Sequence, residues 1–141
     1  MFQKNQFEKI KGDFSMSSVQ NNKEIAVNFL KLVVAGEIDK AYNEYIDING
    51  KHHNTYFPAG FSVLKEGMKE NHVQFPDKLF NVKNVLGDGD LVATHSHLAF
   101  KEGEPGMIVV HLFRFENGKI VEMWDCGQPI QADSPNKDGA F

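Results

Sequence analysis

The fold is decided by residues 107–128, which read MIVVHLFRFENGKIVEMWDCGQ. Apolar and polar side chains alternate on both sides of Glu116-Asn117-Gly118, which is the pattern of two half-buried strands joined by a tight turn. We therefore predict strands over residues 107–115 and 119–128. A three-residue turn with Gly118 in the left-handed conformation would place Phe113 opposite Val121 and His111 opposite Met123.

The preceding residues continue the same period of two. Residues 79–86 and 91–101 predict two more strands, joined by the tight turn Gly87-Asp88-Gly89-Asp90. Residues 102–106 contain Pro105 and predict the loop to the next strand. The last four strands therefore form an antiparallel meander.

The predicted register brings several polar side chains onto one face. With a five-residue loop at 102–106, His97 lies opposite His111 and His95 lies opposite Phe113. A one-residue change in either turn would send these side chains to opposite faces. In the predicted register, the shared face carries His95, His97, His111, Phe113, Met123 and Asp125.

The first half of the chain has the period of helices. Apolar side chains recur at helical spacing over residues 23–35, where Asn21 or Asn22 can cap the helix, and again over 37–46 and 61–73. Residues 49–54 predict a turn or a short strand. Helices followed by a meander indicate an α+β fold, with three N-terminal helices packed on a curved antiparallel or mixed sheet that encloses an interior cavity.

Composition narrows the function classes. The chain has 141 residues, enough for a single domain, and its 15 basic and 19 acidic residues give a net charge of −4, which argues against nucleic acid as a partner. No apolar run is long enough for a membrane span, and the single cysteine fits the cytoplasm. The 12 phenylalanines indicate an aromatic core or an apolar pocket. We expect an N-terminal extension over 1–20, a domain over 21–128 and an irregular tail over 129–141.

Several motifs resemble one known family. Residues 113–125, FRFENGKIVEMWD, resemble the signature of the SnoaL-like polyketide cyclases of the NTF2-like superfamily. Residues 89–97, the pair His53-Asn54 and the tail 136–141 resemble a branch described as catalysing aldol condensation. The resemblance implies a cone-shaped NTF2-like fold and acid/base chemistry without a cofactor. Two positions depart from the branch: Met123 replaces a usual histidine, and His111 replaces a usual aspartate.

These residues favour proton transfer on a small apolar or aromatic carbonyl compound. A carboxylate among phenyl rings is desolvated, so it can exchange protons near neutral pH. Asp125 would act as the base, and His111 with His97 would hold the developing enolate oxygen. The expected substrate-binding residues are His53, Asn54, His95, Phe113 and Met123.

Two other hypotheses remain open at this stage. His95, His97 and His111 could bind zinc or non-haem iron with Asp125 as a fourth ligand, although H-x-H alone is a weak signal and the family resemblance implies no metal. The domain could also bind a small molecule, or dimerise, without catalysis. In either case we expect a homodimer formed through the outer face of the sheet around Leu112 and Trp124.

Overall fold

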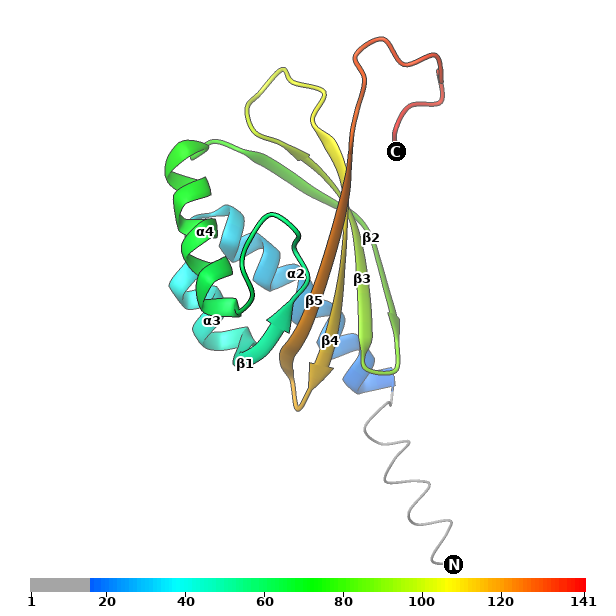
Figure 1. The fold of residues 1–141 in the computed structure, drawn as a ribbon. Helices are drawn as coiled ribbons and strands as arrows, with labels where there is room; N and C mark the ends of the chain where they lie inside the picture. The colour runs from blue at the N-terminus through cyan, green and yellow to red at the C-terminus, as the bar shows by residue number, and fades with distance from the viewer. Residues whose placement is uncertain (1–15) are drawn as a thin grey trace, which may run out of the picture.

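The computed structural model describes residues 16–141, so most of the predicted extension over residues 1–20 lies outside the described part. Figure 1 shows how the helices gather on one side of the strands. In chain order the elements are α2 (Met16–Val34), α3 (Ile38–Tyr45), β1 (Ile46–His52), α4 (Phe61–Gln74), β2 (Leu79–Asp88), β3 (Leu91–Ala99), β4 (Met107–Glu116) and β5 (Lys119–Pro129).

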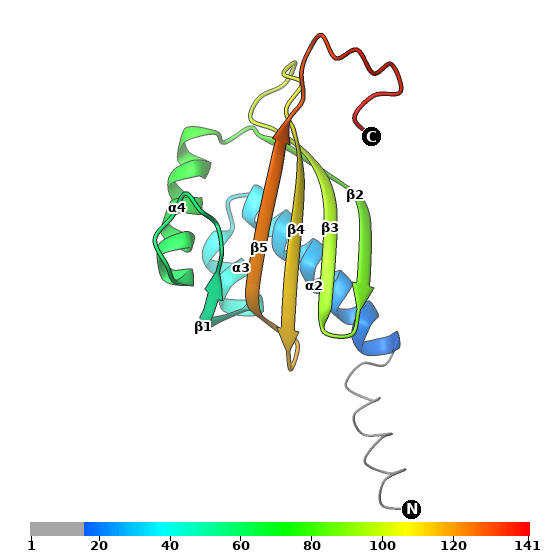
Figure 2. The same cartoon turned by 45° about the vertical axis from the view of Figure 1, so that its right-hand side comes forward.

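The five strands form one mixed sheet in the order β1-β5-β4-β3-β2. Strands β2 to β5 are antiparallel neighbours, as the meander predicts. Strand β1 pairs with β5 in parallel. It begins at Ile46, predicted as the end of a helix, and includes residues 49–52, for which the sequence predicted a turn or a short strand. Figure 2 shows the strands side by side with α2 and α3 behind them. The α+β prediction, with helices packed on a mixed sheet, is confirmed.

Helix α2 begins at Met16, seven residues before the start predicted at Lys23, so Asn22 lies inside the helix and is buried instead of capping it. The additional turns carry Val19, which is 9% exposed. Val19 packs against Gly87 in β2. A β-carbon added to Gly87 would come within 2.6 Å of Val19 Cγ1. Packing against the sheet therefore extends the helix beyond the segment that local sequence signals mark.

The core lies between the helices and the face of the sheet that they cover. Phe29 of α2 makes edge contacts with Tyr42 of α3 and Phe113 of β4, at ring-centroid distances of 5.5 and 6.1 Å. Tyr42 in turn contacts Phe61 of α4 at 6.3 Å. Phe113 is fully buried, which identifies the odd-numbered face of β4 as the covered face. We call this the concave face of the sheet, and the opposite one the convex face.

The chain after Pro129 contains no helix or strand, as predicted for the tail. It rises beyond the end of β5 and turns back toward the sheet (Figures 1 and 2). Its last residue, Phe141, contacts the rings of His95 and His97 on the convex face at 5.3 and 5.1 Å. The end of the tail therefore lies against the outside of the sheet.

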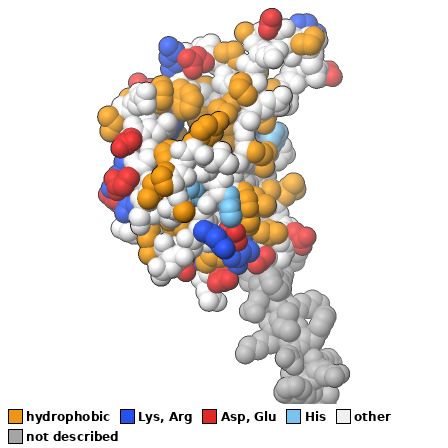
Figure 3. Space-filling view, in the orientation of Figure 1, with side chains coloured by type: hydrophobic (Ala, Val, Ile, Leu, Met, Phe, Trp, Pro, Cys, Tyr) orange, Lys and Arg blue, Asp and Glu red, His pale blue; other side chains and the backbone are white. Residues whose placement is uncertain are grey.

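The outer surface carries charges of both signs. Figure 3 shows basic and acidic side chains next to one another on the face in view, instead of a patch of one sign. Ion pairs on the surface include those of Asp39 with Lys65 and Lys69. No helix within residues 16–141 has the length and apolar character needed to cross a membrane.

Candidate functional site

The β4–β5 hairpin places His111 directly opposite Asp125. The predicted three-residue turn is wrong: Asn117 and Gly118, both at positive φ, form a two-residue turn between the paired residues Glu116 and Lys119. A register shift follows in β5, so the pairs differ from the predicted ones. Because the net displacement is two residues, the predicted face is kept. His111, Phe113, Met123 and Asp125 therefore share the concave face, with Phe113 opposite Met123.

The β3–β4 register differs from the predicted register by an odd number of residues. The side chains of β3 that were predicted for one face of the sheet therefore lie on the other. Strand β3 ends at Ala99 and β4 begins at Met107, which makes the loop longer than the predicted 102–106. His111 faces Thr94 rather than His97. His95 and His97 consequently point to the convex face, opposite Val110 and Ile108. The prediction that they lie beside Asp125 is therefore wrong.

Asp125 is anchored by a side chain from outside the meander. The Asn54 amide nitrogen, in the loop after β1, donates to Oδ2 of Asp125 at 2.9 Å. Both residues are partly exposed. This hydrogen bond fixes one carboxylate oxygen and leaves Oδ1 for another partner. Asn54, one of the expected substrate-binding residues, therefore lies in contact with Asp125.

Asn54 is itself held by its own loop and by His52. Its Oδ1 accepts from the backbone N–H of Tyr56 at 2.9 Å, and its own backbone N–H donates to His52 Nδ1 at 3.1 Å. His52 Nε2 donates to the Pro58 carbonyl at 2.9 Å. These two bonds fix His52 as the neutral Nε2–H tautomer. His52 is only 7% exposed, so it is a buried support for the loop.

His111 is a partly buried residue whose imidazole lies beside a carboxylate. Burial lowers its pKa from 6.5 to about 4, and the charge of Asp125 opposes part of that shift. Its Nδ1 is buried without a hydrogen-bond partner. Its ring stacks on Phe113 at 5.8 Å. At neutral pH, His111 is therefore an uncharged imidazole that can donate one hydrogen bond and accept another.

Strand β3 adds two hydroxyl groups to the same face. Thr94 lies opposite His111, and Ser96 lies opposite Val109. Both side chains are fully buried, and neither hydroxyl oxygen has a hydrogen-bond partner. Together with Asn54, Asp125 and His111, these side chains form a row that runs from the loop after β1 across β5 and β4 to β3. We call this row the polar row: Asn54, Asp125, His111, Thr94 and Ser96.

His53 lies away from the polar row. Its Nε2 donates to Glu122 Oε2 at 2.6 Å, and its ring stacks on Trp124 at 5.1 Å with an interplanar angle of 10°. Glu122 also accepts from Arg114, its cross-strand partner, at 3.1 Å. Both partners of His53 belong to the convex face, because Glu122 and Trp124 pair with Arg114 and Leu112 of β4. The adjacent residues His53 and Asn54 therefore contact side chains on opposite faces of the sheet.

The observed register separates the side chains that the three-histidine metal hypothesis brings together. His95 accepts from the Asn84 amide at 3.0 Å, and His97 donates to the Pro105 carbonyl at 2.8 Å, both on the convex face. His111 and Asp125 lie on the other side of the sheet. Among residues 16–141, no group of three or more histidine, cysteine or acidic side chains is arranged to hold a metal ion.

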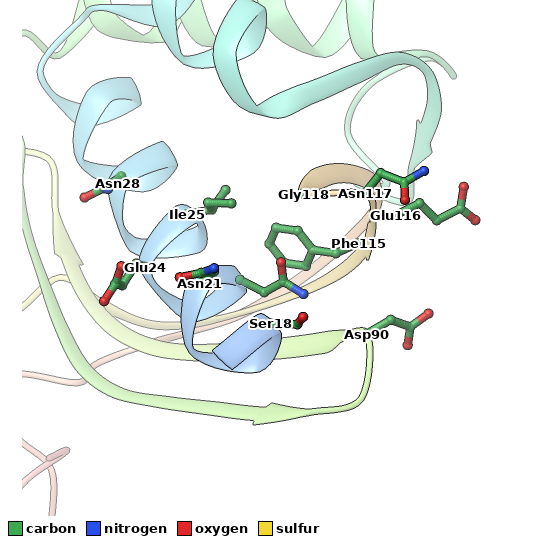
Figure 4. A pocket seen from close by; sticks show the side chains of 11 residues that line it. Ser18, Asn21, Glu24, Ile25, Asn28, Asp90, Phe115, Glu116, Asn117 and Gly118 are labelled. Carbon is green, nitrogen blue, oxygen red and sulfur yellow. The ribbon is translucent and has the colours of Figure 1, made fainter. Parts of the chain in front are cut away.

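A separate hollow of about 720 Å³ lies beside the two hairpin turns. Figure 4 shows Phe115 and Ile25 between helix α2 and the strands, with polar side chains around them. The polar lining includes Asn21, Glu24 and Asp90. None of the predicted site residues lines this hollow, so it is distinct from the polar row.

Comparison with known proteins identifies the family. The sequence model of the SnoaL-like polyketide cyclases matches residues 24–132. The chain belongs to the SnoaL-like polyketide cyclase family. A search of curated proteins found no significant match.

Solved structures share the fold of this SnoaL-like chain. IdmH from Streptomyces antibioticus is 20% identical, with 76% of this chain and 91% of IdmH covered at a TM-score of 0.61. An NTF-2 like protein of unknown function from Burkholderia xenovorans LB400 is 18% identical, with 82% and 89% covered at 0.66. A SnoaL-like protein of unknown function from Burkholderia thailandensis E264 is 15% identical, with 82% and 98% covered at 0.66. These similarities confirm the NTF2-like fold.

Sequence reasoning missed Thr94, Ser96 and His52. In β3 the histidines were selected as site residues, whereas the side chains of Thr94 and Ser96, which alternate with them, are the buried ones. The burial pattern of β3 alternates from Leu91 to His97, with Val92, Thr94 and Ser96 all fully buried. The apolar Val92 is the one sequence signal for that alternation. It would have placed Thr94 and Ser96 inside, because residues two apart share a face.

Proposed function

We propose that this SnoaL-like protein is an acid/base enzyme that promotes aldol-type chemistry on a small apolar carbonyl compound. One observation carries the proposal. Asp125 and His111 face each other on the helix-covered side of the sheet, and Asn54 holds one oxygen of the carboxylate. Phe113 and Met123 supply apolar surface at the adjacent register position.

Asp125 is the proposed base. Its carboxylate removes a proton from a carbon next to a substrate carbonyl, and the electron pair of that C–H bond moves to the carbonyl oxygen as an enolate forms. The enolate carbon then bonds to a second carbonyl carbon, whose oxygen takes up the proton that Asp125 received. No electrons are gained or lost overall, so a carboxylate and hydrogen-bond donors suffice for the reaction. Asn54 acts as a positioning residue, because its side-chain amide donates to the Asp125 carboxylate.

Neutral His111 suits the role of the donor to the enolate oxygen. Because burial lowers its pKa to about 4, the imidazole stays uncharged at neutral pH and can donate its N–H to the oxygen as a neutral group. The earlier expectation shared this role with His97. The corrected register removes His97 from that face and leaves His111 as the imidazole beside Asp125.

The test follows deuterium uptake at the carbon next to the carbonyl, using aromatic ketones, aldehydes and diketones in D₂O. Exchange reports proton abstraction even when no ring forms. Asp125→Asn keeps the side-chain shape and should lower the exchange rate about 100-fold or more. The matched control is Asp88→Asn, which removes an exposed carboxylate at a strand end. Equal rates in both variants, or binding without exchange, would leave a ligand-binding module as the function.

Asn54→Ala sharpens the same test. Loss of the 2.9 Å bond frees the carboxylate to rotate, so we expect a rate decrease of about tenfold, smaller than that for Asp125→Asn. Asn49→Ala in β1 is the control, because Asn49 is exposed and lies on the same strand-and-loop segment. A rate unchanged by Asn54→Ala would remove Asn54 from the site.

We also propose that the protein is a homodimer formed through the convex face. Leu112 and Trp124 pair across β4 and β5 there and remain partly exposed, which favours coverage by a second copy. Gel filtration should give about twice the 15.9 kDa mass of one chain. Leu112→Asp should shift the peak to the mass of a single chain, and a single-chain peak for the unaltered protein contradicts the proposal.

A further inference from the structure

The loop after β1 contacts β5 on both faces of the sheet. The chain runs beside β5 at this point, because the backbone N–H of His53 donates to the Met123 carbonyl at 2.9 Å. The His53 side chain then donates to Glu122 on the convex face. The next side chain, that of Asn54, donates to Asp125 on the concave face. Two adjacent residues therefore hold β5 from opposite sides.

The rest of the loop is attached to itself and to helix α4. The Tyr56 backbone N–H donates to Asn54 Oδ1, so this bond moves with the loop. The Phe57 ring packs on Gly67 of α4, 2.3 Å from the position that a β-carbon would take there. In this loop, which the structure describes in full, the hydrogen bonds and ring contacts to β5 come from its first two residues, His53 and Asn54.

The contact between His53 and β5 combines a short hydrogen bond with a stacked ring. Nε2 donates to Glu122 Oε2 at 2.6 Å, and this bond is the largest cause of the lowered pKa of Glu122. The acceptor is therefore a charged carboxylate, and hydrogen bonds to charged groups are shorter and stronger than neutral ones. The imidazole also lies 5.1 Å from the Trp124 ring, nearly parallel to it. His53 thus fixes the start of the loop from the convex face.

We infer that His53 is a positioning residue, which acts on Asp125 through Asn54 from the opposite face of the sheet. The inference rests on the proposed function, in which Asp125 is the base. The Asn54 donor lies 2.9 Å from Asp125 Oδ2, so a shift of about 1 Å breaks the bond. The α-carbons of adjacent residues are about 3.8 Å apart, and a fixed His53 therefore limits how far Asn54 can move. The convex contact in this way keeps the carboxylate on the concave face oriented.

The first test is a double-mutant cycle on the rate of deuterium exchange. His53→Phe keeps a ring beside Trp124 and removes the donor, and it should lower the rate about fivefold, since the backbone bond to Met123 remains. His53→Gln keeps an N–H donor near the position of Nε2 and should retain most of the rate. In the Asn54→Ala background, His53→Phe should cause no further decrease, because the residue through which His53 acts is absent.

The second test needs no turnover and follows the side-chain amide of Asn54 by NMR. His53→Phe should move these amide signals to the positions of exposed asparagine amides, whereas His53→Gln should leave them nearly unchanged. The matched control is Tyr56→Ala, which alters a side chain of the same loop that is 91% exposed. This variant should change neither the amide signals nor the exchange rate.

The two tests separate the inference from the proposed function. Amide signals of Asn54 that stay in place in His53→Phe would overturn the inference. A fivefold decrease that recurs in the Asn54→Ala background would overturn it as well, because His53 would then act by another route. An exchange rate that Asp125→Asn leaves unchanged would instead refute the proposed function, and the amide signals would still decide whether His53 positions Asn54.

Discussion

The sheet carries two histidine–carboxylate pairs, one on each face, and they behave differently. On the convex face, His53 donates to Glu122 at 2.6 Å, and this bond, followed by the one from Arg114, lowers the pKa of Glu122. On the concave face, His111 lies opposite Asp125, and burial lowers the pKa of the imidazole to about 4. Hydrogen bonding controls the first pair, whereas desolvation controls the second.

This difference separates a structural pair from a candidate site. In the convex pair, each carboxylate oxygen of Glu122 already accepts a hydrogen bond, from His53 or from Arg114, and these bonds stabilise the charged form of Glu122. The concave pair retains a free carboxylate oxygen and an unpartnered ring nitrogen. Residue types alone do not decide which pair has a function. The function of a pair depends on how deeply the pair is buried and on which of its polar groups remain unpartnered.

The largest difference between the two faces should appear in stability. Phe113 is fully buried on the concave face, whereas its neighbour Leu112 is partly exposed on the convex face. Phe113→Ala should lower the free energy of unfolding by about 3–5 kcal/mol. Leu112→Ala should lower it by about 1 kcal/mol or less, since less apolar area leaves water. Urea unfolding measures both, and equal losses would break the distinction between the faces.

The buried imidazole should make stability depend on pH. The folded pKa of His111 is about 4 against an ordinary 6.5, so between these values the unfolded chain binds a proton that the native protein does not. Stability should therefore fall as pH decreases from 6.5 to 4, by on the order of 3 kcal/mol from this residue. His111→Gln should flatten that part of the curve. Parallel curves for the two proteins would show that His111 is solvated.

Much of the fold could be predicted from residues 107–128, because alternation and a turn signal define a hairpin locally. The concave positions of His111, Phe113, Met123 and Asp125 followed from that hairpin and are confirmed, although their partners differ by two residues. Across the longer loop between β3 and β4, local signals do not fix the register. There the prediction failed, and His95 and His97 were assigned to the wrong face.

Parts of the site made by distant contacts were harder to predict. The bond from Asn54 to Asp125 depends on β1 pairing in parallel with β5, a long-range contact that no local motif encodes. The family resemblance singled out Asn54, but it also singled out His53, which lies with Glu122 and Trp124. Adjacent residues in a loop can therefore serve opposite faces, and sequence proximity does not distinguish them.

The smallest effect should come from the tail on the convex face. Phe141 is 46% exposed and contacts His95, His97 and the Lys83 ammonium, which lies 5.3 Å from its ring centroid. Exposed contacts of this kind contribute about 1 kcal/mol or less. Phe141→Ala should therefore change the free energy of unfolding by no more than that and leave deuterium exchange intact. A loss of exchange would connect the tail to the site.

The most direct test is an NMR titration of the His111 imidazole in the unaltered protein and in Asp125→Asn. With the site as described, the ring of His111 remains neutral until the pH falls to about 4. Removing the charge of Asp125 should lower the midpoint further, because that carboxylate favours the protonated ring. A midpoint near 6.5, or one that Asp125→Asn leaves unchanged, would contradict a desolvated His111 beside the charge of Asp125 on the concave face.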